Sequence, residues 1–182
     1  MYYLTQRLIL RTLEIDEANL CLDYLVRNKD FLANWEPKRN EEYYTLKNAE
    51  KILHQKIFEN ETKKGVHLFL FLKDEKNLIG SISISNILWG AFLSCFLGYK
   101  LDKDFTNKGY MTEGIEEVIS ICFNDYKLHR IEANIIPRNA ASIRVVEKLG
   151  FEYEGTSKKY LEINGVWEDH HHYVLLNESV EQ

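Results

Sequence analysis

The alternation of apolar and polar residues along the chain predicts short strands and amphipathic helices. Period-two alternation and runs of β-branched or aromatic residues predict strands, whereas apolar residues three or four positions apart predict helices. The predicted strands cover residues 8–11, 66–73, 78–87, 92–101, 130–136, 160–163 and 166–176, and one more begins at residue 151. The predicted helices cover residues 18–25, 46–59 and 110–124 and a short stretch after residue 139. We therefore expect one α/β (α+β) domain over residues 1–182, with a mostly antiparallel mixed sheet of about seven strands flanked by about four helices.

Capping and turn residues predict where several of these elements begin and end. Asp16 lies where a helix N-cap belongs, Pro137 ends the strand before it because proline has no N–H to donate, and Asn139 caps the next helix. Asn164 and Gly165 form the strongest two-residue hairpin signal, because both positions of that turn need a positive φ. The strands on either side of residues 164–165 should therefore pair as a β-hairpin.

Composition and charge exclude several classes of function. The net charge of −5 argues against a nucleic-acid backbone as the main partner, because such binding depends on clustered lysine and arginine. No apolar run reaches the length of about 18 residues that a membrane span needs, and residues 1–13 alternate in polarity, unlike a signal peptide. The three cysteines are widely separated in apolar surroundings, unlike a disulfide framework or a zinc site. We expect a cytoplasmic protein with no membrane or nucleic-acid partner and no bound metal.

The segment 107–112 is a candidate anion-binding loop. It follows a predicted strand and opens a predicted helix, so free backbone N–H groups and the positive end of the helix dipole meet there. Gly109 would let a ligand approach the backbone closely. A single glycine at a helix start is more often a simple turn or cap, and the chain has neither a P-loop nor a dinucleotide-binding pattern. The loop alone does not decide between an anion site and a turn.

Further stretches, taken with this loop, resemble the GNAT acetyltransferase superfamily. They read Leu128-His129-Arg130-Ile131-Glu132-Ala133 and Pro137-Arg138-Asn139-Ala140-Ala141-Ser142, then Glu147-Lys148-Leu149-Gly150-Phe151 and Tyr153-Glu154-Gly155. Within the superfamily the chain is similar to the ribosomal-protein N-terminal acetyltransferase branch (RimJ/RimL-like). That similarity includes the opening Thr5-Gln6-Arg7-Leu8-Ile9-Leu10-Arg11 and the strand–turn–strand of residues 160–169, and it is clearest over residues 97–176.

The resemblance implies a GNAT fold in which two neighbouring strands splay apart, so that the pantetheine arm of acetyl-CoA enters the gap between them. Here those strands would be residues 92–101 and 130–136. The implied cofactor residues are Tyr99, Leu101, Asn107, Lys108, Gly109, Tyr110, Met111, Thr112, Asn139 and Ser142. The superfamily loop usually begins with Gln or Arg and ends with Gly or Ala, whereas this chain has Thr106 and Met111. Because the binding groups are mostly backbone N–H, the change is compatible with binding, although Met111 adds bulk.

The resemblance also implies catalytic roles. A serine in the position of Ser142 would protonate the departing thiolate, and the alternative is that Ser142 only supports the helix start. A glutamate from the late strands would be the base, and Glu162 is the nearest carboxylate, although the register places Leu161 at the matching position. Glu36, or a water ordered by backbone carbonyls, is the alternative base. The candidate substrate residues are Trp35, Glu36 and Trp89.

Three functions remain open from the sequence. The first is transfer of acetyl from acetyl-CoA to a protein N-terminal α-amino group by direct attack in a ternary complex, and the second is acetylation of a small-molecule amine. An α-amino group has a pKa near 7.7 to 8.0 and needs less help from a base than lysine, which favours the first. The third is a non-catalytic acyl-CoA-binding module, suggested by Met111 and by the missing base. The oligomeric state is open, a homo-oligomer included.

Overall fold

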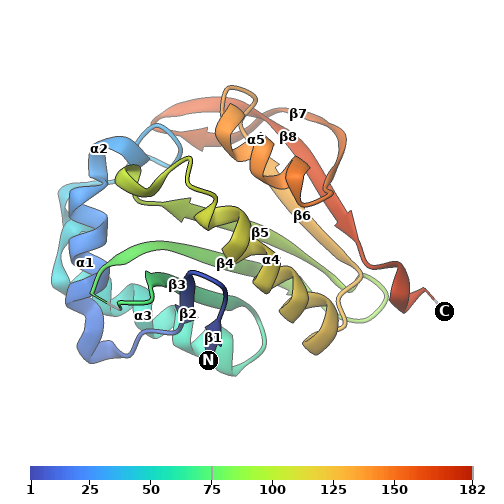
Figure 1. The fold of residues 1–182 in the computed structure, drawn as a ribbon. Coiled ribbons are helices and arrows are strands. Elements are labelled where there is room, and N and C mark those ends of the chain that lie inside the picture. Colours follow the sequence, from blue (N-terminus) through green and yellow to red (C-terminus); the bar gives the residue numbers. More distant parts are fainter. Residues whose placement is uncertain (75, 182) are drawn as a thin grey trace.

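The computed structural model describes residues 1–74 and 76–181, and within them the chain forms one eight-stranded sheet in the order β1-β2-β3-β4-β5-β6-β8-β7 (Figure 1). The strands are β1 (Tyr2–Leu4), β2 (Leu8–Arg11), β3 (Val66–Leu72), β4 (Leu78–Leu88), β5 (Ser94–Leu101), β6 (Arg130–Ile135), β7 (Glu152–Ile163) and β8 (Val166–Leu176). Neighbouring strands pair antiparallel except β5 and β6, which are parallel. The sheet is therefore mixed and mostly antiparallel, as predicted.

Five α-helices cover the two faces of this sheet within the described residues. They are α1 (Ala18–Arg27), α2 (Lys29–Leu32), α3 (Leu46–Glu61), α4 (Tyr110–Ser120) and α5 (Ala140–Lys148). Figure 1 shows α4 and α5 lying over one face, with α3 on the opposite side. None of the helices in the described ranges is long and apolar enough to cross a membrane.

Alternation along the strands explains why the sheet has two cores. In β3, Leu68 and Leu70 pack in the cluster that contains Ile115 of α4, whereas Phe69 and Phe71 pack in a second cluster with residues of α1 and α3. Successive side chains of a strand point to opposite faces, so a fully apolar strand must be covered on both sides. The central strands are therefore sandwiched between two helical layers.

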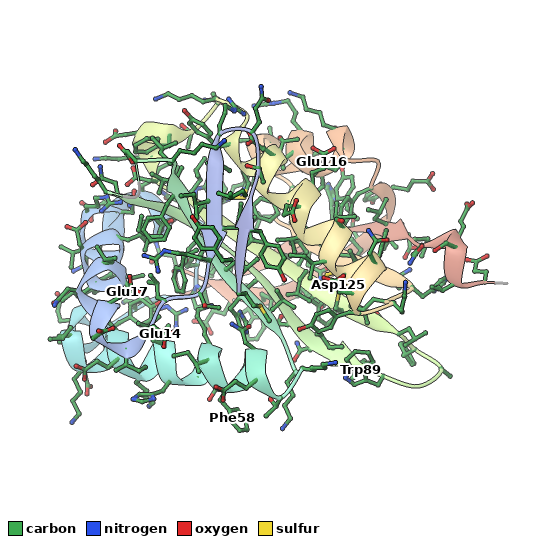
Figure 2. All side chains as sticks on the ribbon, turned by 60° about the horizontal axis from the view of Figure 1, so that its bottom comes forward. Glu14, Glu17, Phe58, Trp89, Glu116 and Asp125 are labelled. Atoms are coloured by element: carbon green, nitrogen blue, oxygen red, sulfur yellow. The ribbon has the colours of Figure 1, made fainter. Side chains whose placement is uncertain are left out.

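The elements differ from prediction in several places. Asp16 does not cap α1: the chain first makes a 3-10 turn, η1 (Ile15–Glu17), in which the Glu17 carboxylate accepts from the Glu14 N–H at 3.0 Å (Figure 2). The predicted helix 110–124 ends as an α-helix at Ser120 and continues as a π-helical turn, η4 (Ile121–Asp125). The predicted strands at 151 and 160–163 are one bulged strand, β7, and β1 was not predicted.

The splayed strands implied by the resemblance are visible in the hydrogen-bonding register. β5 and β6 pair at only three positions, Ser94 with Arg130, Cys95 with Ile131 and Phe96 with Glu132. Beyond that point β5 continues beside β4 to Leu101, and β6 continues beside β8 to Ile135. The backbone edges that face each other after Phe96 are therefore not paired with one another, and the sheet opens there.

Candidate active site

A cavity of about 450 Å³ lies at this opening. Its walls come from four parts of the chain that are far apart in sequence: α2 and the residues after it, the end of β5, the loop before α4, and α5. The lining residues are Phe31, Leu32, Trp35, Glu36, Tyr99, Lys100, Leu101, Thr106, Asn107, Gly109, Met111, Thr112, Asn139, Ala141, Ser142, Arg144, Val145 and Lys148. A cavity of this size with a few convergent polar groups is typical of a small-molecule site.

The loop before α4 has the geometry of an anion site. Asn107 and Gly109 both have positive φ, 60° and 80°, and Gly109 is the N-cap residue of α4. The first intrahelical bond runs from the Glu113 N–H to the Gly109 carbonyl at 3.1 Å, so the N–H groups before Glu113 are not used inside the helix. These donors and the helix dipole suit a phosphate group. The loop is therefore suited to bind an anionic group.

Met111, the atypical residue of the loop, packs into the protein interior. Its side chain is only 5% exposed and belongs to the core cluster on the α4 side of the sheet. The core therefore absorbs most of the bulk that methionine adds to this position.

Ser142 is held at two points beside the cavity. Its N–H donates to Asn139 Oδ1 at 3.2 Å, so Asn139 caps α5 as predicted. Its hydroxyl lies 2.6 Å from the Tyr99 hydroxyl, which also donates to the Ser142 carbonyl at 3.1 Å. Burial, opposed by the hydrogen bond to Ser142, raises the pKa of Tyr99 to about 12. The Tyr99 hydroxyl therefore stays protonated, and the pair links β5 to α5.

Glu36 and Lys100 form an ion pair in the wall opposite α5. The Lys100 Nζ lies 2.8 Å from Glu36 Oε1, and the two side chains are 26% and 20% exposed. Burial disfavours the charged Lys100, but the Glu36 carboxylate outweighs it, and the pKa of Lys100 is raised. The Glu36 carbonyl accepts from the N–H of Asn164 at 3.0 Å, so the turn between β7 and β8 fixes this wall.

Trp35 lies next to Glu36 and is held from outside. The Arg138 guanidinium carbon lies 4.9 Å from the centre of the Trp35 ring, and Arg138 Nη2 donates to Glu168 Oε1 at 2.9 Å. Arg138 is thus engaged by a ring and a carboxylate. It holds the tryptophan at the cavity wall.

The structure brings most of the sequence-predicted site residues to this cavity. Tyr99, Leu101, Asn107, Gly109, Met111, Thr112, Asn139 and Ser142 line it, as do Trp35 and Glu36. Lys108 and Tyr110 belong to the same loop but do not line the cavity, and Lys108 Nζ donates to the Asp104 carbonyl at 2.8 Å.

Trp89 and Glu162 lie elsewhere. Trp89 is 48% exposed and stacks on Tyr126 with ring centres 6.2 Å apart, at the end of α4 opposite to Gly109 (Figure 2). Glu162 is exposed on β7, paired in register with Trp167, and is not among the cavity residues. Neither side chain is placed to meet a ligand bound in the cavity.

Several cavity residues were not predicted from the sequence. Arg144 and Lys148 of α5 add positive charge to the lining, and Lys100 supplies the partner of Glu36. The spacing of Arg144 and Lys148, four residues apart on a predicted helix beginning at Asn139, was the available signal for a basic face.

Comparison with known proteins agrees with the geometry. A family model described as an acetyltransferase (GNAT) domain matches residues 7–152, which is most of the chain. The chain belongs to the GNAT acetyltransferase family. As a GNAT protein it is an acetyl-CoA-dependent N-acetyltransferase, and the alternative of a non-catalytic acyl-CoA-binding module is corrected by this membership and by its enzyme relatives.

Two relatives of this GNAT chain match along most of its length. "Probable N-acetyltransferase YjcK" of Bacillus subtilis (strain 168) is 40% identical over 172 residues, 94% of this chain and 95% of the relative. The ribosomal protein uS5-alanine N-acetyltransferase of Escherichia coli (strain K12) is 35% identical over 166 residues, 91% of this chain and 86% of the relative. These identities confirm the RimJ/RimL-like branch that the motifs indicated.

Solved GNAT structures superimpose closely on this one. Ribosomal-protein-S5-alanine acetyltransferase from Vibrio fischeri has a TM-score of 0.93 at 34% identity, covering 98% of this chain and 97% of that chain. Mycobacterium smegmatis RimJ, solved with CoA-disulfide, has a TM-score of 0.90 at 25% identity, covering 100% of this chain and 89% of that chain. The predicted GNAT fold is confirmed.

Proposed function

We propose that this GNAT enzyme acetylates a primary amine, above all the N-terminal α-amino group of a ribosomal protein, by direct attack in a ternary complex. The observation that carries the proposal is one continuous cavity. Its lining contains the anion loop around Gly109 together with Ser142 and Glu36. A donor thioester and an acceptor amine can therefore meet without a covalent enzyme intermediate.

Ser142 is the proposed general acid. When the amine nitrogen forms its bond to the thioester carbonyl carbon and the carbon–sulfur bond breaks, the sulfur leaves as a thiolate that needs a proton. The Ser142 hydroxyl lines the cavity and is hydrogen-bonded to Tyr99, whose own proton is retained. Ser142 gives its proton to the thiolate, the Tyr99 hydroxyl donates a hydrogen bond to the resulting alkoxide, and a proton from solvent then restores the Ser142 hydroxyl.

Glu36 is the proposed acceptor for the proton of the amine. It is a carboxylate in the cavity wall, and it lies beside Trp35, whose ring offers an apolar face to the residue that carries the amine. The position of Glu162, exposed on β7 and outside the cavity lining, favours Glu36 over Glu162 as the base. The Lys100 ammonium lies 2.8 Å from the Glu36 carboxylate and restrains its position.

The modest base machinery supports an α-amino acceptor. A protein α-amino group has a reference pKa of about 7.7 to 8.0, so a useful fraction is neutral at pH 7, whereas lysine at about 10.4 is almost fully charged. Two relatives named above are alanine N-acetyltransferases of a ribosomal protein. The proposal assumes a cytoplasmic enzyme, which agrees with the three free, buried cysteines.

A panel of acceptors tests the proposal. Release of coenzyme A thiol is measured with peptides that carry the N-terminal sequences of ribosomal proteins, with the same peptides blocked at the N-terminus, and with polyamines and free amino acids. We expect turnover on the unblocked peptides only, and intersecting lines in two-substrate kinetics. Turnover confined to small amines would replace the acceptor class, and parallel lines would contradict the ternary complex.

A further inference from the structure

Arg7 fastens the turn between β1 and β2 to the start of α4. Its main-chain N–H donates to Glu113 Oε1 at 2.7 Å, and its Nε donates to Glu113 Oε2 at 2.6 Å. The hydroxyl of Thr5 donates to the same carboxylate at 2.5 Å. Burial of Glu113 is outweighed by these bonds, led by Thr5 and Arg7, and the pKa of Glu113 is lowered. The carboxylate is therefore ionised and fully engaged by the N-terminal segment.

The same guanidinium reaches the anion loop itself. Arg7 Nη1 donates to the Lys108 carbonyl at 2.9 Å, and the guanidinium carbon lies 4.6 Å from the centre of the Tyr110 ring. Nη2 lies 3.3 Å from the position that a Cβ on Gly109 would take. Arg7 thus touches the residue on each side of Gly109 and lies against Gly109, whose positive φ forms the loop.

The first residue of the loop is short and neutral. The loop opens with Thr106 and so has no arginine at its first residue. The Thr106 hydroxyl donates to the Lys103 carbonyl at 2.9 Å, so it serves the preceding 3-10 turn, η3 (Lys103–Phe105). A neutral, short side chain cannot supply the charge or reach of arginine.

We infer that Arg7 is a positioning residue for the phosphate groups of acetyl-CoA, and that it supplies from the N-terminal hairpin the guanidinium that the loop lacks at Thr106. Arg7 holds the Lys108 carbonyl and so directs the following N–H groups toward the anion. Its charge is paired with the Glu113 carboxylate at 2.6 Å, so Arg7 acts through the loop backbone that it holds and not through an added net charge. The inference rests on the proposed use of this loop for the pyrophosphate.

A series of three acetyl donors tests the role. Acetyl-CoA has the pyrophosphate and the 3′-phosphate, acetyl-dephospho-CoA keeps only the pyrophosphate, and S-acetylpantetheine has neither. For Arg7→Met we expect kcat/KM to fall about tenfold with the first two donors and to change less than about twofold with the third, because only donors that carry the pyrophosphate use the N–H groups that Arg7 positions. Arg7→Lys keeps the charge but loses the planar guanidinium with its several N–H donors. Its kcat/KM with the first two donors should therefore lie between those of the wild type and Arg7→Met.

Arg11→Met is the matched control. Arg11 belongs to the same hairpin, forms a two-bonded ion pair with Glu17 at 2.7 and 2.9 Å, and stacks on Phe71, which packs in the core on the α1 and α3 side of the sheet. The Arg11→Met variant should lower the melting temperature and change kcat/KM equally for all three donors.

An equal loss on all three donors for Arg7→Met, or no loss at all, would overturn the inference. Should Arg7→Met fail to fold, the donor pattern of Arg7→Lys decides by the same rule. Failure of the wild-type protein to bind acetyl-CoA would instead count against the proposed use of the loop, so the two failures are distinguishable.

Discussion

At the scale of single residues, the double restraint on Ser142 makes its substitution informative. We expect Ser142→Ala to lower kcat by about 10²-fold to 10⁴-fold, the range of a lost general acid. The affinity for acetyl-CoA should change little, because the Asn139 cap uses the backbone N–H of residue 142, which alanine keeps. Thiol release gives kcat and calorimetric titration gives the affinity. Unchanged turnover would leave Ser142 with a capping role alone.

Tyr99→Phe separates the hydroxyl pair from the packing of the ring. Phenylalanine keeps the buried ring and removes the hydrogen bond of 2.6 Å to the Ser142 hydroxyl. We expect a smaller loss of kcat than in Ser142→Ala, because Ser142 still carries its proton. A loss larger than that of Ser142→Ala would make Tyr99 itself the acid.

Glu36 and Glu162 form a matched pair for the proton acceptor. Glu36→Gln should lower kcat at pH 7 by about tenfold or more and steepen the dependence of the rate on pH, because a more alkaline solution must then deprotonate the amine. Glu162→Gln should leave the pH–rate profile unchanged, since Glu162 is exposed and outside the cavity. The reverse result would restore Glu162 as the base.

The sequence predicts a site residue well when that residue acts through local backbone structure, and poorly when its contacts are distant in the chain. Gly109 and Asn139 act through backbone conformation and capping, which are local and readable in the sequence. Arg7 reaches a loop about a hundred positions away, and its contact is invisible to local pattern. The prediction for Trp89 rests on its residue type, and aromatic character does not say at which end of a strand a side chain lies.

At the scale of elements, a buried polar network joins α3 to β3 and β4. Lys56 Nζ donates to Ser83 Oγ at 3.0 Å and lies 3.3 Å from His67 Nδ1, and His67 Nε2 lies 2.5 Å from Glu59 Oε2. Burial first, and then the charge of Lys56, lower the pKa of His67 to about 4 against the effect of Glu59. A neutral His67 satisfies both of these contacts, because it donates from Nε2 to Glu59 and accepts at Nδ1 from Lys56.

The network predicts an acid-sensitive stability. An unfolded histidine binds a proton near pH 6.5 and the folded His67 only near pH 4, so the unfolded state takes up more protons between these values. The contribution of His67 to the free energy of unfolding is fully present above pH 6.5. It should fall by up to about 3 kcal/mol as the pH drops to 4. Urea unfolding at several pH values measures this slope. His67→Gln keeps a donor and an acceptor and should flatten the curve; identical curves would contradict the role of His67.

Turn and cap residues explain which elements the sequence predicted well. Asn164 and Gly165 have the positive φ values, 47° and 84°, that their hairpin requires, and Thr45 caps α3 through its hydroxyl. β1 is three residues long and carries too few positions to show alternation. β7 contains two register shifts that break the period-two pattern, which is why it read as two separate strands.

At the scale of the whole molecule, the cavity draws on elements from most of the chain, so acetyl-CoA should stabilise the fold as a unit. A ligand present at a hundred times its Kd adds about 2.7 kcal/mol to the free energy of unfolding. The melting temperature should therefore rise with acetyl-CoA concentration, and Gly109→Ala should reduce the rise, because alanine disfavours the φ of 80° and its Cβ would lie 3.3 Å from Arg7 Nη2. No shift at saturating acetyl-CoA would contradict the site.

β5 and β6 separate after Phe96, and in the proposed complex the pantetheine arm of acetyl-CoA lies between the two backbone edges that no longer pair with one another. Bound acetyl-CoA then contributes part of the stability of the folded protein. When acetyl-CoA is scarce, the two halves of the sheet are joined directly by only three residue pairs. The resistance of the protein to proteolysis should therefore increase with the acetyl-CoA concentration. The abundance of the enzyme would then depend on the acetyl-CoA level of the cell.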